Sequence, residues 1–163
     1  MMYRKEKNEK DVRYILDNLR ADDLEEVKAV HGENWKEAVF ESIMKTDFDV
    51  LMGINKDGDV PVCMGGAWHI ARDQKGVGVV WMLCTDDVVN HKHCLLRELK
   101  KEFRKYDQKF WYLYNFIYCK NEFAKKWLMW IGFKFDNPRP IGLNIPKEFE
   151  YFYRIKKIRG LEI

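Results

Sequence analysis

The stretch CTDDVVNHKHCLLRE, residues 84–98, contains three side chains that can bind metals or move protons, namely His91, His93 and Cys94. Imidazole and thiolate groups bind zinc when three or four of them converge on one ion. The stretch is expected to open a helix, and helical residues two positions apart point to different faces. The spacing therefore predicts no closed zinc site, and we expect no metal.

Other common chemistries have no motif in the chain. There is no G-x-S-x-G pattern for a Ser-His-Asp hydrolase, no Walker loop and no dinucleotide fingerprint. A basic helix face formed by Lys100, Lys101, Arg104 and Lys105 has no aromatic reader motif beside it. Nucleic-acid binding is therefore not the expected function, although an adapter role for the basic half remains an alternative.

Length and composition predict one folded domain over residues 1–163, because 10 Phe, 8 Tyr and 6 Trp are far more than disordered chains carry. No apolar run approaches the length of a membrane span, and no signal peptide is recognised. We therefore expect an intracellular protein that is not associated with a membrane. The cysteines at 63, 84, 94 and 119 have no C-x-x-C spacing and are expected to be buried thiols.

Charge is divided unevenly along the chain. Residues 1–90 contain 12 Lys and Arg against 18 Asp and Glu, whereas residues 91–163 contain 17 against 8. The basic second half could favour an anionic partner, and the alternative is a solvated charged surface.

Hydrophobic periodicity predicts an α/β protein with a mixed sheet covered by helices on both faces. A weak alternation suggests that residues 11–19 begin as a strand. Helices are expected from Asp22 or Asp23, from Asn34, over 91–106 and over 121–133. Strands are expected at 49–55, 61–70, 77–85, 109–119 and 149–158.

The helix NEFAKKWLMWIGF, residues 121–133, resembles the corresponding helix of the acetyl-CoA-dependent N-acyltransferases, the GNAT family. Asn121, Ala124, Gly132 and Phe133 match that family's N-x-x-A…G-F pattern. The order of elements also resembles the GNAT fold over nearly the whole chain. The resemblance implies that residues 79–85 and 109–119 form neighbouring strands that diverge at their C-terminal ends, with acetyl-CoA between them. Periodicity places Trp127 on the buried side of the helix.

A narrower resemblance is to GNAT-like phage proteins labelled internal virion or head-assembly proteins of short-tailed phages. The similar stretches are LRADDLEEV (19–27), WMLCTDD (81–87), YLYNFIYCKN (112–121), WLMWIGF (127–133), PIG (140–142) and FEYF (149–152). This resemblance implies phage or host proteins as partners, and a location in the cytoplasm of the host cell or inside the virion.

Acetyl-CoA needs a cradle for its pyrophosphate, which the GNAT family supplies with Q/R-x-x-G-x-G/A after the fourth strand. The corresponding segment here has no glycine, and Asp86 and Asp87 would repel phosphate. The resemblance assigns cofactor binding to Leu83, Cys84, Thr85, His91, Lys92, His93 and Asn121. Because side chains crowd the segment, acetyl-CoA is expected to bind weakly or not at all.

Proton transfer raises a second question. Many family members use a helical tyrosine as the acid for the leaving thiolate, and here Leu128 stands at that position. Tyr114, Tyr118 and Cys119 are the candidate replacements, and each could equally be a packing residue. The sequence thus favours a non-catalytic or weakly catalytic phage virion or assembly protein. The alternative is a working acetyl-CoA-dependent N-acetyltransferase that acts on a protein or small-molecule amine.

Overall fold

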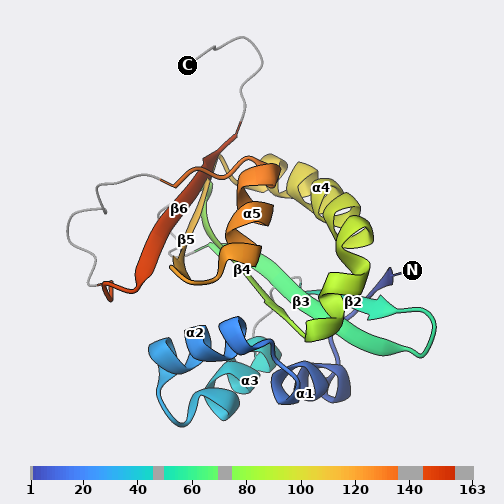
Figure 1. The fold of residues 1–163 in the computed structure, drawn as a ribbon. Coiled ribbons are helices and arrows are strands. Elements are labelled where there is room, and N and C mark those ends of the chain that lie inside the picture. The colour runs from blue at the N-terminus through green and yellow to red at the C-terminus, as the bar shows by residue number, and fades with distance from the viewer. Residues whose placement is uncertain (1, 46–49, 70–74, 136–144, 157–163) are drawn as a thin grey trace. The chain divides into compact units, whose positions relative to one another are not determined.

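The computed structural model describes residues 2–45, 50–69, 75–135 and 145–156 (Figure 1). The PIG stretch at 140–142 lies outside these residues. The elements in chain order are β1 (Met2–Lys5), α1 (Glu9–Asp17), α2 (Ala21–His31), α3 (Trp35–Lys45), β2 (Leu51–Asn55), β3 (Val60–His69), β4 (Val77–Cys84), the 3₁₀ helix η1 (Asp86–His91), α4 (Lys92–Lys109), β5 (Tyr112–Tyr118), α5 (Glu122–Ile131) and β6 (Phe149–Ile155).

Six strands form one mixed sheet in the order β1-β2-β3-β4-β5-β6. The chain groups into two compact units, which are described separately. Unit 1 comprises Met1–Ala67 and Trp81–Glu98, and unit 2 comprises Trp68–Val80 and Leu99–Ile163. The prediction of a single domain over the whole chain stays a prediction. None of the described helices is long and apolar enough to cross a membrane.

The core of unit 1 forms where α1, α2 and α3 bury their apolar faces with β2 and β3. Its members, all buried, are Val12, Ile15, Leu16, Val27, Trp35, Val39, Phe40, Ile43, Val50, Met52, Ile54 and Met64. Helical spacing in each of the three helices places these residues on one side, as an amphipathic helix requires.

The prediction that residues 11–19 begin as a strand is wrong. Asn8 caps α1, since its side-chain Oδ1 accepts a hydrogen bond of 3.0 Å from the amide of Asp11. Val12, Ile15 and Leu16 then follow at helical spacing and are all buried. Capping and burial together outweigh the weak alternation of the segment. The first strand is instead β1, which pairs antiparallel with β2 and was not predicted.

Within unit 2, β4 and β5 are parallel neighbours, and their backbone pairing covers only Val77–Val79 and Tyr112–Tyr114. The next residue of β5, Asn115, donates from its side-chain Nδ2 to the carbonyl of Val80 at 2.8 Å. The predicted adjacency of these strands is therefore confirmed, and so is the expectation that they do not pair along their full length.

One face of β5 and β6 in unit 2 is covered by α4 and α5. Phe133, which follows α5, makes edge contacts with Phe103 of α4 and with Phe152 of β6. Arg154 of β6 also forms a two-pronged ion pair with Asp107 of α4. Figure 1 shows α4 and α5 on the same side of these strands.

The predicted motif of α5 is confirmed. Asn121 caps the helix by accepting a hydrogen bond of 3.2 Å from the amide of Ala124. Gly132 ends it in the left-handed conformation, with φ of 102°, which glycine adopts without steric cost. Trp127 is buried as expected, with 7% of its surface exposed.

Candidate functional site

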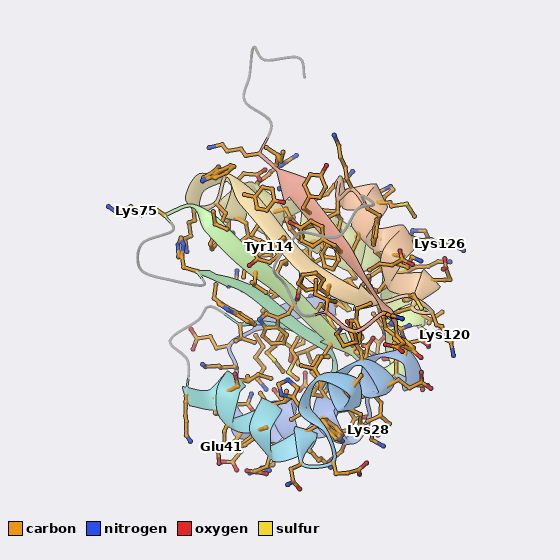
Figure 2. All side chains as sticks on the ribbon, turned by 90° about the vertical axis from the view of Figure 1, so that its left-hand side faces the viewer. Lys28, Glu41, Lys75, Tyr114, Lys120 and Lys126 are labelled. Carbon is orange, nitrogen blue, oxygen red and sulfur yellow. The ribbon has the colours of Figure 1, made fainter. Side chains whose placement is uncertain are left out.

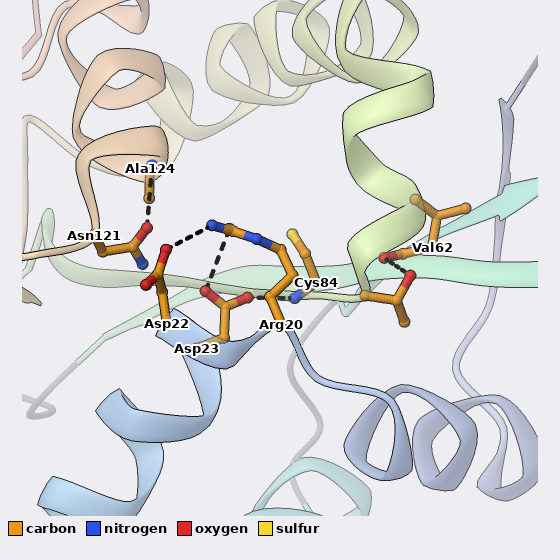
Figure 3. A network of polar contacts seen from close by, with 8 residues as sticks. Arg20, Asp22, Asp23, Val62, Cys84, Asn121 and Ala124 are labelled. Atoms are coloured by element: carbon orange, nitrogen blue, oxygen red, sulfur yellow. Dashed lines mark hydrogen bonds and ion pairs between the residues drawn. The ribbon is translucent and has the colours of Figure 1, made fainter.

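A buried ion pair holds the end of β4 in unit 1. Asp23, in the first turn of α2, accepts a hydrogen bond of 2.8 Å from the backbone amide of Cys84. Its other carboxylate oxygen lies 3.4 Å from the guanidinium of Arg20, which also contacts Asp22 at 3.1 Å. Arg20 and Asp23 are both buried, so this network fixes where β4 ends (Figure 3).

Cys84 and Thr85, two of the predicted cofactor-binding residues, have structural partners. The hydroxyl of Thr85 donates to the carbonyl of Val62 at 3.2 Å, and both side chains are buried. A hydrogen bond with Cys63, burial and the nearby Asp23 raise the pKa of the Cys84 thiol, so this thiol stays protonated. Leu83 packs partly buried against the core of unit 1. Their contribution to cofactor binding stays a prediction.

A 3₁₀ helix, η1, occupies the segment where a glycine-rich phosphate loop would be expected. It continues directly into α4 through Lys92, which has helical φ and ψ. The side chain of Val88 is fully buried, so it does not obstruct the exposed side of the segment, contrary to the expectation that every side chain there stands in the way. Asp86, in contrast, is exposed.

Three polar groups compensate the charge of Asp87. Its carboxylate accepts hydrogen bonds from Asn55 at 3.4 Å and from Asn90 at 3.0 Å, and it lies 3.3 Å from Nε2 of His91. His91 is thereby held against Asp87. Lys92 and His93 are exposed at the first turn of α4. The structure thus leaves two side chains at the helix start that could meet an anion.

The exposed side chains of Lys92 and His93 could contact a diphosphate, whereas the segment has no glycine with which to form a backbone cradle. Lys92 and His93 lie in the first turn of α4, which continues from η1 without a break, so the free helix terminus is at Asp86 and adds no dipole attraction at these two side chains. The exposed carboxylate of Asp86 opposes the binding of an anion here. Asn121, the remaining predicted contact, is buried and already occupied by its capping hydrogen bond in unit 2 (Figure 3).

Of the three candidate proton donors, the structure places two on one face of β5. Tyr114 and Tyr118 are four residues apart on the strand and therefore point to the same side. Both are partly exposed. Cys119 follows the strand in the turn before α5, where its amide donates to the carbonyl of Glu148 at 2.7 Å. Burial, followed by the neighbouring Tyr112, raises the pKa of Tyr114.

Three further tyrosines share this face and were not singled out from the sequence. Tyr112 lies on β5, and Tyr151 and Tyr153 lie on β6. In Figure 2, Tyr114 lies on the side of β5 that faces the viewer, while α5 lies behind the strands. The signal was present as aromatic residues at every second position in both segments, 112–118 and 149–153.

The histidines and cysteines do not come together as a metal site within the described parts of the chain. No group of three His, Cys, Asp or Glu side chains there has an arrangement that could hold an ion. His91 contacts Asp87, whereas His93 is exposed and Cys94 is partly buried.

Solved structures similar to this chain are acetyltransferases. An acetyltransferase of the GNAT family from Streptococcus pneumoniae superposes with a TM-score of 0.64 at 14% identity, covering 96% of this chain and 100% of that one. The ribosomal-protein-S18-alanine N-acetyltransferase of Escherichia coli gives 0.63 at 13% identity and covers 100% of both chains. PaiA N-acetyltransferase from Thermoplasma acidophilum, in complex with coenzyme A, gives 0.60 at 12% identity, covering 95% and 99%.

Sequence comparison adds no closer relationship. No protein-family model matches the chain, and no curated protein matches it. None of the matching structures described above is a phage virion or head-assembly protein. At these identities the likeness concerns the fold, and together with the strand order and the partial β4–β5 pairing it shows that this chain has the GNAT acetyltransferase fold.

Proposed function

We propose that the chain is an acetyl-CoA-dependent N-acetyltransferase that acts on a primary amine of a protein or a small molecule. The observation that carries this proposal is the likeness, over nearly the whole of both chains, to acetyltransferases that include a coenzyme A complex. The named acceptor of one of them, the alanine of ribosomal protein S18, presents an amine.

Acetyl transfer needs two proton movements. The attacking ammonium must lose a proton, and the sulfur that leaves the acetyl group must gain one. Acetyl-CoA supplies the acetyl group as an activated thioester. Tyr114 is the first candidate for the acid, because its phenol carries a proton and its side chain is partly exposed, although burial raises its pKa and so makes it a weaker acid. Tyr118 is the second candidate, since it lies on the same face of β5, and Cys119 is the third.

Binding of the cofactor's phosphates falls to the start of α4. Lys92 is the exposed cation there, His93 is an exposed side chain that can donate a hydrogen bond, and Asp86 is the exposed negative charge that opposes an anion. We expect the affinity to be modest and to depend strongly on salt, because exposed charges are screened over about 8–10 Å at physiological ionic strength.

Isothermal titration of the full chain with acetyl-CoA, followed by a thiol-release assay with a panel of amines, tests the proposal. We expect binding with a dissociation constant below about 1 mM, the upper end of ordinary Michaelis constants. Tyr114→Phe should lower kcat by about 100-fold with little change in KM, because a general acid typically contributes at least that factor. Tyr14→Phe, an exposed tyrosine on α1, is the matched control.

The absence of any heat of binding at millimolar acetyl-CoA would contradict the proposed acetyltransferase activity. The chain would then have the GNAT fold without its catalytic activity. The glycine-free segment 86–93 is the feature that favours this second reading. Its placement in a phage particle rests on the sequence resemblance alone, and mass spectrometry of purified particles and assembly intermediates would test it.

A further inference from the structure

Four tyrosines form a closed group on the face of β5 and β6 opposite to α4 and α5. Their ring centroids are separated by 6.0 Å from Tyr112 to Tyr114, 5.9 Å from Tyr114 to Tyr151, 5.9 Å from Tyr151 to Tyr153 and 5.8 Å from Tyr153 to Tyr112. The rings therefore pack against one another around a circuit, which we call the tyrosine group. Phe116 extends it, at 5.3 Å from Tyr151.

The β5 and β6 positions on the face that carries the tyrosine group hold no charged side chain, but the exposed Lys134 pairs with Tyr153 in an antiparallel bridge and so lies on the same face. The antiparallel register places on it Tyr112, Tyr114, Phe116, Tyr118, Phe149, Tyr151, Tyr153 and Ile155. The charged residues of β6, Glu150 and Arg154, contact Lys125 of α5 and Asp107 of α4, and so belong to the opposite face. The four tyrosines are partly exposed.

Hydroxyl oxygens meet at one place in the group. The hydroxyls of Tyr112 and Tyr151 are hydrogen-bonded to each other. One O–H serves this bond, so the pair retains a single donor while both oxygens keep lone pairs that can accept. Burial, followed by the bond to Tyr112, raises the pKa of Tyr151, which keeps the phenol neutral. The pair is therefore mainly an acceptor for hydrogen bonds.

The chain itself already places an ammonium on this face. Nζ of Lys120 lies over the ring of Tyr118 at 5.9 Å from the centroid. This distance is within the range in which the negative face of an aromatic ring attracts a cation. Lys120 thus shows that the aromatic face is compatible with a primary ammonium, and it does so at the end of the same row of β5 side chains.

We propose that the tyrosine group binds the acceptor substrate, a primary ammonium carried on an apolar or aromatic body, with its N–H groups donating to the hydroxyls of Tyr112 and Tyr151 and its body lying over the adjacent rings. The assignment of this amine as the acetyl acceptor rests on the proposed acetyltransferase activity. The binding site itself is defined by the four tyrosines of unit 2.

The chemistry of the face also selects against other amines. A polyamine needs a second negative partner for its further charges, and the eight paired positions offer no carboxylate. A carboxylate beside the amine would raise the pKa of the amine and so oppose the deprotonation that acyl transfer requires.

Titration of the full chain in the absence of acetyl-CoA tests the site. The probes are 2-phenylethylamine, its neutral analogue 2-phenylethanol, and spermidine, all at pH 7.5. We expect the amine to bind about tenfold more tightly than the alcohol, as charge-assisted hydrogen bonds and cation–π contacts predict. Tyr151→Phe removes one oxygen and should weaken binding of the amine about fivefold, whereas Tyr14→Phe should leave it unchanged. Thermal melts establish that each variant is folded.

Equal affinity for the amine and the alcohol, or an unchanged affinity in folded Tyr151→Phe, would overturn the proposal. If spermidine bound as tightly as 2-phenylethylamine, the proposed requirement for an apolar or aromatic body on the ligand would be contradicted. A separate titration with acetyl-CoA distinguishes the two levels. If acetyl-CoA fails to bind while the hydroxyl-dependent amine binding persists, the proposed acetyltransferase activity is rejected and the proposed amine-binding site is retained. If acetyl-CoA binds and the amine does not, the tyrosine group is not the acceptor site.

Discussion

The carboxylate of Asp23 accepts a hydrogen bond of 2.8 Å from the backbone amide of Cys84, which lies 61 positions further along the chain. The first turn of α2 is thereby tied to the end of β4 within unit 1, next to the backbone hydrogen bond of 3.0 Å from the amide of Arg20 to the carbonyl of Cys84. The same carboxylate is paired with Arg20, and both side chains are less than a tenth exposed. The contact is thus a buried charge with a specific backbone partner.

Asp23→Ala should destabilise the protein by about 3–5 kcal/mol, because it leaves the buried guanidinium of Arg20 with Asp22, a partly exposed partner, and removes the acceptor of the Cys84 amide. Urea denaturation followed by tryptophan fluorescence measures the loss. Asp22→Ala is the matched control. Asp22 is 40% exposed and contacts the same guanidinium, so its loss should cost less than about 1 kcal/mol. Equal effects of the two variants would contradict the structural role of Asp23.

Trp127→Ala should cost about 3–5 kcal/mol, since truncation of a buried tryptophan removes apolar contacts and leaves a cavity. Trp130→Ala, on the same helix, is the control. Trp130 is 50% exposed, and the ammonium of Lys100 lies 4.0 Å from the centroid of its ring, so about 0.5–1 kcal/mol should be lost. Thermal melts of both variants report the difference, and an unchanged melting temperature in Trp127→Ala would refute the orientation of α5.

Asp86→Asn should strengthen the binding of coenzyme A, because it removes an exposed negative charge just before α4. The gain is expected to be about twofold to fivefold at low salt and to vanish near 1 M salt, where the screening length falls to about 3 Å. Isothermal titration at the two salt concentrations measures it, with Glu33→Gln as an exposed control in unit 1. Val88 should be left unchanged in variants of this segment, because its side chain is fully buried.

Stability should fall as the pH rises above about 10, and Tyr151 should contribute to that fall. The folded state raises the pKa of Tyr151 above its usual value of 10.0 through burial and the bond to Tyr112. The unfolded chain therefore loses the phenolic proton first, which favours unfolding as the pH increases. Because lysines titrate in the same range, the comparison of melting temperatures between the native chain and Tyr151→Phe isolates the effect. Parallel curves for the two proteins would contradict it.

Local signals were sufficient for the elements whose ends are set by their own residues. The cap at Asn121 and the left-handed Gly132 bound α5 within one stretch of chain, so the helix could be predicted with its buried Trp127. The segment of α1 was misjudged for the opposite reason. Its cap residue, Asn8, lies before the apolar positions, and the short alternation within the segment resembles a strand even though Val12, Ile15 and Leu16 have helical spacing.

The candidate site depended on contacts between distant segments, which periodicity does not reveal. The aromatic residues of β5 and β6 are visible in the sequence, but their common face depends on the antiparallel register that sets Tyr114 opposite Tyr153. Likewise, no local pattern links Asp87 to Asn55, so the compensation of its charge could not be foreseen. The acidic pair before α4 was therefore judged more repulsive than the structure makes it.

The side chain of Asn115 ends the backbone pairing between β4 and β5. Its side-chain amide donates to the carbonyl of Val80, and its Oδ1 accepts from the amide of Phe116, directly after the last backbone pair. The polar groups at this point are thus satisfied before any ligand arrives. A ligand that used the carbonyl of Val80 or the amide of Phe116 would have to displace the side chain of Asn115, so these two groups are closed to a competing strand or solvent unless Asn115 moves.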